Sequence, residues 1–290
     1  MAGMGAVRRA ATVRDCLRSG PSGAWRSIAT IRLPERTADG GGPDRPRRTV
    51  VAERAFDVTG ALLLGVAMLP VLVALSVAVK VESPGPVLYR ARRVGHRGSR
   101  LALLKFRKMR HDAQGPHLTV RADPRLTGVG RFLVRTHLDE LPQLWHVLRG
   151  EMSLVGPRPE DPRFVACHHD AYQEVLSVRP GLTGWTQLVL ADEGAVLAEA
   201  DDPVQLYLDE ILPAKVALDA AYVGAGGVLG DAKVLAWTVL VLVFGFAVVV
   251  DTDRRELRLV RPPADEPFGL PLDADLAAEL APDIAVDLAG

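Results

Sequence analysis

The stretch "VTGALLLGVAMLPVLVALSVAVKV", Val58 to Val81, carries no charged side chain before Lys80. Such a run is long enough to cross a bilayer, because a transmembrane helix needs about 20 apolar residues. Pro70 lies in the middle of the run, and a proline inside a helix removes a backbone hydrogen bond and kinks the chain. Each arm beside Pro70 has about a dozen residues, or about 18 Å of α-helix, which reaches little farther than the midplane of a bilayer.

Basic residues flank this apolar run on both sides. Arg47, Arg48 and Arg54 precede it, and Arg90, Arg92, Arg93 and Arg97 follow it. Because positive residues favour the cytoplasmic side of a membrane, a helix that enters, breaks at Pro70 and returns satisfies both flanks. We therefore expect residues 51–81 to form a re-entrant membrane helix. The alternatives are a straight span, which would leave one basic cluster outside, and a buried helix of a soluble protein.

The rest of the chain divides by composition. Residues 1–50 are rich in Arg, Gly and Pro, and we expect a disordered basic tail there. Residues 82–233 are predicted to form a cytosolic catalytic domain. The uncharged run 234–250 predicts an apolar helix that crosses the membrane, lies at its interface or packs on the first hairpin. Residues 251–290 are acidic and are expected to be largely disordered, apart from a short helix near "DADLAAEL".

Short strands and helices are expected within residues 82–233. The segments "PVLYRARRV" and "RLALLKFRKM" are typical of two strands joined by the turn "GHRG". "LDELPQLWHVL" predicts a short helix that ends at Gly150, "VRPGLTGW" predicts a turn, and 203–222 predicts a helix interrupted at Pro213. The predicted fold is therefore α+β, in a small membrane-associated domain with a proline-broken re-entrant N-terminal helix, short strands and interfacial helices.

The sequence lacks the patterns that are typical of several classes of protein. The two cysteines, Cys16 and Cys167, have no metal-ligand spacing. The sequence contains neither a Walker A motif nor G-x-G-x-x-G, which argues against a Rossmann nucleotide fold. A basic block over residues 82–135 indicates an anionic partner, but no nucleic-acid-binding module with stacking aromatic residues accompanies it. We therefore expect no nucleic acid among the partners.

The segment "HLDELPQLWHVLRGEMSLVGPRP", His137 to Pro159, places two adjacent carboxylates, Asp139 and Glu140, before a proline. Adjacent helical residues point about 100° apart, so the two acids suit two different tasks. One carboxylate can act as a nucleophile, and its neighbour can hold Mg²⁺ together with substrate phosphates. Alternatively, Thr136-x-x-Asp139 resembles a capping box, in which the acids serve only to start a helix.

Several ordered blocks of the chain together resemble the bacterial sugar transferase family, the monotopic phosphoglycosyl transferases. The blocks are "SPGPVLYRARRVG", "LLKFRKM", "DPRLTGVGRFL", "HLDELPQLWHVLRGEMSLVGPRP" and "RPGLTGWTQ". The resemblance implies that a sugar 1-phosphate passes from a UDP-sugar to a polyprenyl phosphate such as undecaprenyl phosphate. It also implies that Asp139 is the nucleophile, which forms a covalent phosphosugar intermediate with release of UMP, and that Glu140 is the Mg²⁺ ligand.

The same resemblance implies a set of basic groups around the substrate. Four residues are predicted on this ground to bind its phosphates: Lys105, Arg158, Arg179 and Arg135. Arg135 stands one position beyond the arginine that is usual in the family, where this chain has Val134. His137 replaces a usual serine, and the segment after Gln187 also departs from the family pattern. The sugar is therefore left open.

The resemblance also implies a location and partners. It places the protein on the cytoplasmic face of the bacterial inner membrane, at the start of exopolysaccharide, capsule or O-antigen synthesis. The expected partners are a nucleotide diphosphate sugar, a polyprenyl phosphate and membrane lipid, and a homo-oligomer is left open. The alternative function is a catalytically silent membrane scaffold of a glycan assembly system, which the departures at Val134 and after Gln187 suggest.

Overall fold

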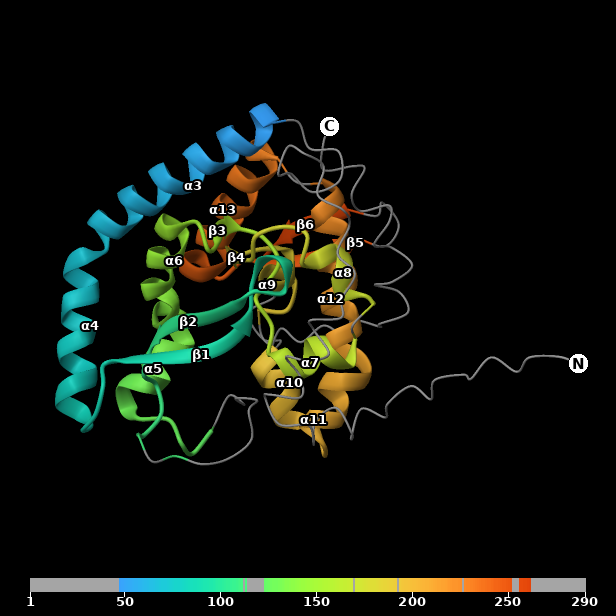
Figure 1. Ribbon diagram of the computed structural model, residues 1–290. Coiled ribbons are helices and arrows are strands. Elements are labelled where there is room, and N and C mark those ends of the chain that lie inside the picture. Colours follow the sequence, from blue (N-terminus) through green and yellow to red (C-terminus); the bar gives the residue numbers. More distant parts are fainter. Residues whose placement is uncertain are drawn as a thin grey trace, which may run out of the picture.

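The computed structural model describes residues 47–111, 113, 123–168, 170–191, 193–225, 227–251 and 256–261. Within these ranges, helices and two-stranded sheets form a mixed structure, which confirms the predicted α+β class. Figure 1 shows the first two helices of this part along one side of the other elements. The predicted disorder of residues 1–46 and 262–290, and the predicted helix near "DADLAAEL", lie outside the described residues.

A break at Met68 divides the long apolar run into two helices, α3 (Arg47–Ala67) and α4 (Leu69–Glu82), which are bent by 61°. The break lies beside Pro70, whose ring and missing N–H disrupt the preceding helical turn. In the described part of the chain, no single helix is long and apolar enough to cross a membrane, whereas this bent pair meets the requirement together. Since α3 begins at Arg47, the predicted basic tail over 1–50 extends a few residues too far.

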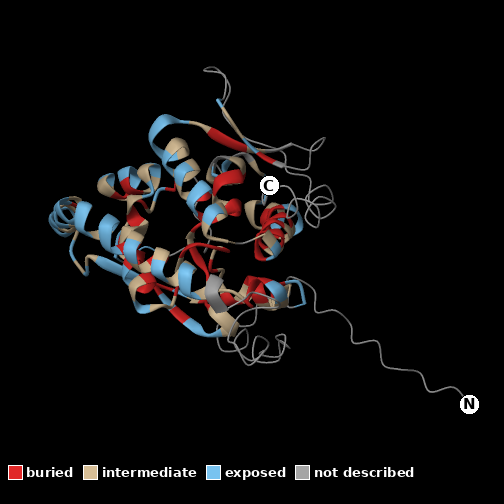
Figure 2. Cartoon of the chain, turned by 90° about the horizontal axis from the view of Figure 1, so that it is seen from above, coloured by how far each residue is buried: buried red, intermediate tan, exposed pale blue. Residues whose placement is uncertain are grey.

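The α3–α4 pair packs against the other elements along one face only. Helix α3 contacts α6 (Leu144–Arg149), β3 (Ser153–Val155) and α13 (Val228–Phe244), whereas α4 contacts α5 (Gly128–Thr136). Asp57 and Ala61 of α3 are buried, and Leu75 and Val79 of α4 are buried as well. On the other face, large apolar side chains remain exposed: Leu62, Leu63, Val66, Leu69, Val73, Val77 and Val81. Figure 2 shows this alternation of buried and exposed segments along the elements.

The predicted pair of strands is confirmed. Strand β1 (Leu88–Val94) pairs antiparallel with β2 (Arg100–Phe106), and a 3-10 turn, η1 (His96–Gly98), joins them. The register places Tyr89 opposite Lys105. Further along the chain, helix α5 (Gly128–Thr136) begins at Thr127, whose side chain accepts a hydrogen bond from the backbone of Gly130. Phe106 and Leu133 join α4, β2 and α5 in a small apolar core.

The acidic segment forms a 3-10 helix, η2 (Leu138–Gln143), that continues directly into helix α6 (Leu144–Arg149). Pro142 lies inside the 3-10 helix, and Gly150, with a φ of 78°, ends α6 in the left-handed conformation. The predicted short helix ending at Gly150 is therefore confirmed, although its first half is the tighter form. The 3-10 helix packs on β2, which brings the acids beside the strand that carries Lys105.

Two short strands hold the segment that follows α6. Strand β3 (Ser153–Val155) pairs in parallel with β4 (Gly181–Thr183), so part of the predicted turn "VRPGLTGW" is a strand. The backbones of Gly156 and Gly181 approach closely, since a Cβ atom on Gly181 would lie 2.1 Å from the nitrogen of Gly156. This close approach places Pro157, Arg158 and Pro159 directly after β3, within reach of the acidic pair.

The second half of the chain contributes a layer of helices: α7 (Pro162–Cys167), α8 (Tyr172–Val175), α9 (Trp185–Val189), α10 (Glu193–Glu199), α11 (Pro203–Leu206) and α12 (Leu212–Ala225). A π-helical turn, η3 (Tyr207–Ile211), connects α11 to α12 without a break. The interruption predicted at Pro213 is thus a widened turn. A wider turn just before a proline accommodates its ring and its missing donor while the helix continues.

The C-terminal elements differ from the prediction. Helix α13 (Val228–Phe244) begins inside the predicted catalytic domain and ends at Gly245, which has a φ of 68°. The predicted helix over 234–250 is therefore wrong at both ends, because residues 247–251 form strand β5 (Ala247–Asp251). This strand pairs antiparallel with β6 (Glu256–Val260), inside the predicted disordered tail. Val248 and Leu257 are buried in the main core, which explains why this hairpin is ordered.

Candidate active site

The 3-10 helix η2 presents Asp139 and Glu140 in different surroundings. Asp139 is 3% exposed, and Glu140 is partly buried. The capping-box interpretation is wrong, because no side chain caps the start of η2. The hydroxyl of Thr136 instead donates to the carbonyl oxygen of Phe132, 2.8 Å away, in the last turn of α5. Thr136 therefore does not cap η2.

Each acid has its own cations. Lys105 Nζ lies 2.7 Å from Glu140 Oε1. Arg158 contacts both oxygens of the same carboxylate, with Nη2 2.6 Å from Oε1 and Nη1 3.2 Å from Oε2. Asp139 Oδ2 has a longer contact of 3.5 Å with Lys108 Nζ. Glu140 is therefore held tightly by two cations, whereas Asp139 is paired more loosely with one.

The surroundings of Glu140 favour its charged form. Burial by itself would raise the pKa of Glu140, but the charges of Arg158 and Lys105 and their hydrogen bonds hold this pKa well below its usual value. Glu140 in turn raises the pKa of Arg158. Burial lowers the pKa of Lys105, and the charge of Glu140 opposes this effect. These three groups thus form a buried charged cluster beside Asp139.

Two of the four predicted phosphate-binding cations lie away from this cluster. Arg179 Nη2 lies 3.6 Å from Asp57 Oδ2 on helix α3. Asp57 also accepts hydrogen bonds from Ser153 Oγ at 2.7 Å and from the backbone nitrogen of Leu154 at 2.8 Å. Arg135 is exposed in the last turn of α5, and the described contacts include no ion pair between it and the acids. The structure brings Lys105 and Arg158 to the acidic pair, and a phosphate role for all four cations stays a prediction.

Sequence reasoning missed Lys108. It lies in the basic block after β2, three positions beyond Lys105, among many arginines. Only the packing of the loop after β2 against α5 and η2 brings its ammonium to Asp139. A lysine three residues after a predicted site lysine is a weak signal that could have raised it as a candidate.

A second polar network, which sequence reasoning also missed, supports the backbone of Arg158. Asp219 of α12 is buried, accepts a hydrogen bond from the hydroxyl of Thr186, and receives a further one from the backbone of Arg158. Glu160 accepts a hydrogen bond from Tyr207 at 2.7 Å and lies 3.8 Å from Lys215. Contacts from α12 and η3 therefore fix the segment that carries Arg158.

A family comparison supports the same part of the chain. The model of the bacterial sugar transferase family matches residues 48–245. The chain belongs to the bacterial sugar transferase family. The predicted family is thus confirmed, and the matched region contains the acidic pair, the cations around it and the α3–α4 pair. Helix α13 is included up to its C-terminal glycine.

Individual relatives of this chain carry related names. An undecaprenyl-phosphate glucose phosphotransferase of Komagataeibacter xylinus is 38% identical over 66% of this chain and 35% of its own length. A UDP-glucose:undecaprenyl-phosphate glucose-1-phosphate transferase of Caulobacter vibrioides is 37% identical over 69% of this chain and 72% of its own length. An exopolysaccharide production protein of Rhizobium leguminosarum is 34% identical over 66% of this chain and 94% of its own length. The chain spans about a third of the length of several relatives, the Komagataeibacter protein among them.

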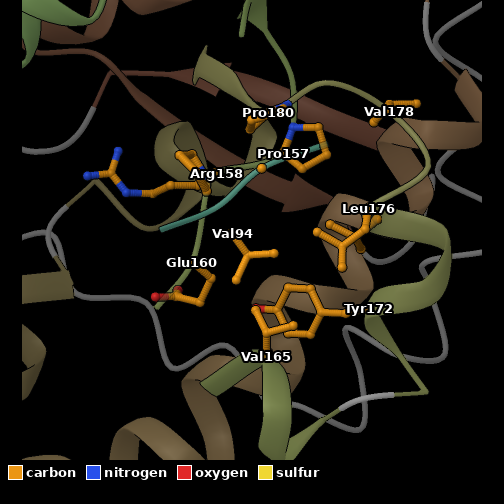
Figure 3. A pocket seen from close by; sticks show the side chains of 12 residues that line it. Val94, Pro157, Arg158, Glu160, Val165, Tyr172, Leu176, Val178 and Pro180 are labelled. Atoms are coloured by element: carbon orange, nitrogen blue, oxygen red, sulfur yellow. The ribbon is translucent and has the colours of Figure 1, made fainter. Parts of the chain in front are cut away.

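A small cavity is lined in part by Arg158. Figure 3 shows the side chain of Arg158 extending away from Tyr172 and Leu176, which lie on the opposite side of the labelled residues. The remaining lining is mainly apolar, with Val94 and Val165 among its side chains. Because this lining is mainly apolar and also contains the carboxylate of Glu160, the charged cluster around Glu140 is the better candidate for the substrate phosphates.

The carboxylates of the acidic pair fit Mg²⁺ only together with ligands from a substrate. The described residues contain no group of three or more His, Cys, Asp or Glu side chains that could hold a metal ion. Glu140 Oε1 accepts two hydrogen bonds, whereas Oε2 accepts one, from Arg158, and so keeps one lone pair. Mg²⁺ is commonly held by one or two carboxylates plus substrate phosphates. The donor set therefore fits an ion that binds with a diphosphate.

Proposed function

We propose that this protein transfers a sugar 1-phosphate from a UDP-sugar to a polyprenyl phosphate such as undecaprenyl phosphate, and thereby starts synthesis of a surface glycan. The observation that carries the proposal is the adjacent pair Asp139–Glu140, one buried and one partly buried, whose two carboxylates have separate cations. The names of the Komagataeibacter and Caulobacter relatives support undecaprenyl phosphate as the acceptor class, and the latter name supports a UDP-sugar as donor. The name of the Rhizobium relative supports exopolysaccharide among the glycans.

Asp139 is the proposed nucleophile. One of its carboxylate oxygens attacks the phosphorus that is bonded to the sugar, an O–P bond forms, and the bond from that phosphorus to the bridging diphosphate oxygen breaks. UMP leaves with the electron pair of the broken bond. An oxygen of the polyprenyl phosphate then attacks the same phosphorus and regenerates the carboxylate. Because Asp139 is only 3% exposed, few water molecules compete with the lipid for the covalent intermediate.

Glu140 has a separate task in this proposal. It orders Lys105 and Arg158 beside the nucleophile, and these cations bind the oxygens of the diphosphate. Glu140 would hold Mg²⁺ with the substrate phosphates, and the bound ion would neutralise charge on the diphosphate and on departing UMP. The low pKa of Glu140 suits this task, since a metal ligand must be ionised.

The α3–α4 pair is the proposed membrane anchor. Its bend of 61° and its exposed apolar face support a re-entrant helix that enters and leaves on the cytoplasmic face of the inner membrane. Helix α13 packs on α3, and three apolar residues near its C-terminal end are exposed: Leu242, Val243 and Phe244. We propose that this end of α13 contacts lipid at the interface. A polyprenyl phosphate in the bilayer could then reach a site held beside the membrane.

Label transfer tests the proposed reaction. Purified protein in detergent or nanodiscs is incubated with Mg²⁺ and a UDP-sugar labelled in the phosphate next to the sugar, with UDP-glucose, UDP-galactose and UDP-N-acetylgalactosamine compared. Label is expected on the protein, with one UMP released per labelled chain, and it should move to lipid when undecaprenyl phosphate is added. Asp139→Asn should abolish label on both protein and lipid. The matched control is Asp201→Asn, because Asp201 is exposed.

The same assay separates the two functions considered for this chain. Transfer to lipid that survives Asp139→Asn would contradict the covalent mechanism. If the wild-type protein turns over no UDP-sugar in the presence of the lipid acceptor, the enzyme proposal fails and the scaffold is favoured. A scaffold would still bind membranes but would release no UMP.

Cysteine accessibility tests the membrane topology. In a background with Cys16→Ser and Cys167→Ser, single cysteines are placed at the exposed positions Val51, in the first turns of α3, and Pro86, just after α4. A re-entrant helix predicts that a membrane-impermeant thiol reagent labels both positions from the cytoplasmic side. Labelling of the two positions from opposite sides would contradict the re-entrant helix and favour a straight span.

A further inference from the structure

Lys108 lies at the nucleophile itself, although the family resemblance assigned it no role. Its Nζ is 3.5 Å from Asp139 Oδ2, whereas Lys105 and Arg158 pair with Glu140. We infer that Lys108 is a catalytic residue that passes from the carboxylate of Asp139 to the transferred phosphate and stabilises the charge that develops there. The inference rests on the proposed function, since it names a further residue for the same reaction.

The backbone of Lys108 is held in place by the start of helix α5. The backbone nitrogen of Thr127 donates to the carbonyl oxygen of Lys108 at 3.1 Å. Gly130 packs so closely against this carbonyl group that a Cβ atom at position 130 would lie 1.9 Å from its oxygen. The next residue, Met109, forms an isolated antiparallel β-bridge with Leu126. The side chain of Lys108 therefore extends toward Asp139 from a fixed point.

The exposure of the two side chains places Lys108 on the accessible side of the pair. The side chain of Lys108 is 25% exposed, whereas that of Asp139 is 5% exposed. By comparison, the side chain of Lys105 is 11% exposed. A phosphate that reaches Asp139 from solvent therefore meets the more exposed side chain of Lys108 first.

The length of the contact suits a cation that changes its partner. Charge-assisted hydrogen bonds between an ammonium and a carboxylate are typically about 2.7–2.9 Å long, and the Lys105–Glu140 contact has this length. The Lys108–Asp139 contact is longer, so the oxygen of Asp139 is less tightly held and can approach a phosphorus atom. An ammonium has three donors, and it can contact a phosphate oxygen while it stays near Asp139.

In the proposed reaction, negative charge moves from the carboxylate of Asp139 to the phosphoryl group and UMP. When Asp139 forms its O–P bond, the carboxylate becomes a neutral acyl group, and negative charge collects on the phosphoryl oxygens and on the oxygen of UMP. A cation that moves from the carboxylate to the phosphoryl oxygens favours this redistribution, because it then acts more strongly on the transition state than on the ground state. Lys108 neither gives nor takes a proton in this step. UMP departs with the electron pair, so no further reactant is needed.

Single-turnover labelling of the full-length protein tests the inference. Lys108→Met should label with sugar phosphate about 100-fold more slowly than wild type at saturating UDP-sugar, a loss typical of removing one charge-stabilising donor. The half-saturating UDP-sugar concentration should change by less than about threefold, because the effect belongs to the transition state. Lys108→Arg should recover much of the rate. The matched control is Lys233→Met, on the exposed side of α13, where Nζ lies 4.9 Å from the ring of Trp237.

Chemical rescue separates a catalytic role from a structural one. Lys108→Ala should label slowly, and added ethylammonium should raise its rate several-fold without affecting Lys233→Met. Labelling of Lys108→Met within threefold of wild type, or a slow Lys108→Ala that no alkylammonium ion accelerates, would overturn the inference while label on the wild-type protein leaves the proposed function standing. Absence of label on the wild-type protein would overturn both.

Discussion

Arg158 and Glu140 form a bidentate ion pair, in which Nη2 of Arg158 lies 2.6 Å from Oε1 of Glu140 and Nη1 lies 3.2 Å from Oε2. The pair joins two segments of the chain that carry the chemistry, the 3-10 helix with the acids and the loop after β3. A planar guanidinium matches a carboxylate at two points, which fixes the orientation of both side chains. The orientation of the cluster therefore depends on arginine at this position.

Arg158→Lys should lower the rate of label transfer by about 10- to 100-fold, although the positive charge is kept. An ammonium is a single point charge and cannot contact both oxygens of Glu140 in the same geometry. The measurement is the initial rate of UMP release at saturating UDP-sugar. Arg149→Lys, at an exposed site on α6, serves as control and should leave the rate unchanged. Equal rates for wild type and Arg158→Lys would show that charge alone is sufficient.

Asp219 should make the stability of the protein depend on pH. Burial raises the pKa of this carboxyl group to about 7 in the folded protein, from 3.8 as the ordinary value. Between these values the folded state binds more protons than the unfolded state, so stability should fall as the pH rises from about 4 to about 7. The contribution is at most about 1.4 kcal/mol per pH unit. Asp219→Asn should flatten this dependence, because the amide does not titrate and its oxygen still accepts from Thr186.

Denaturant unfolding at several pH values between 4 and 8 measures the effect of Asp219. The difference in unfolding free energy between the variant and wild type should grow in favour of Asp219→Asn toward pH 7. Asp209→Asn, in the exposed part of η3, should follow wild type at every pH. Parallel curves for Asp219→Asn and wild type would contradict the raised pKa.

Asp57 should anchor helix α3 to strand β3. Its buried carboxylate accepts hydrogen bonds from Ser153 Oγ and from the backbone of Leu154, and it lies 3.6 Å from Arg179. Asp57→Ala leaves the backbone N–H of Leu154 buried without this acceptor, which should cost about 3 kcal/mol of unfolding free energy. Asp57→Asn keeps an oxygen acceptor and should cost clearly less. Equal losses for the two variants would indicate that charge, rather than the hydrogen bonds, anchors α3.

Gly181 should tolerate no side chain. A Cβ atom there would lie 2.1 Å from the nitrogen of Gly156 and 2.6 Å from its oxygen, and both atoms belong to backbone that cannot turn aside. Gly181→Ala should therefore separate β3 from β4, shift Arg158 and abolish label transfer. Gly230→Ala is the control, because a Cβ atom at position 230 meets no atom within 4 Å. A folded Gly181→Ala protein with normal label transfer would contradict the close packing of these strands.

Local features were predictable from the sequence because short-range interactions determine them. Pro70 disrupts the helix wherever the apolar run lies, and Gly150 ends α6 because it adopts positive φ without steric cost. The alternating strands joined by "GHRG" likewise pair across a short turn. The C-terminal end of the helix predicted over 234–250 was wrong because the short-range pattern was the only guide there. A continuous apolar run does not distinguish a helix from a buried strand, so residues 247–250 were assigned to the wrong element.

The sequence by itself determined the family, the acidic pair and the break at Pro70, since ordered motifs and local sterics carry these features. Only the tertiary structure decided which cation serves which acid. Arg158 and Glu140 are 18 positions apart, and Lys105 and Glu140 are 35 apart, so their contacts depend on how β2, η2 and the loop after β3 pack. The same packing turns Arg179 toward Asp57 and brings Lys108 to Asp139. The sequence shows which side chains are charged but not which of them are in contact. The fold decides these contacts, because it fixes the position of the backbone that carries each side chain.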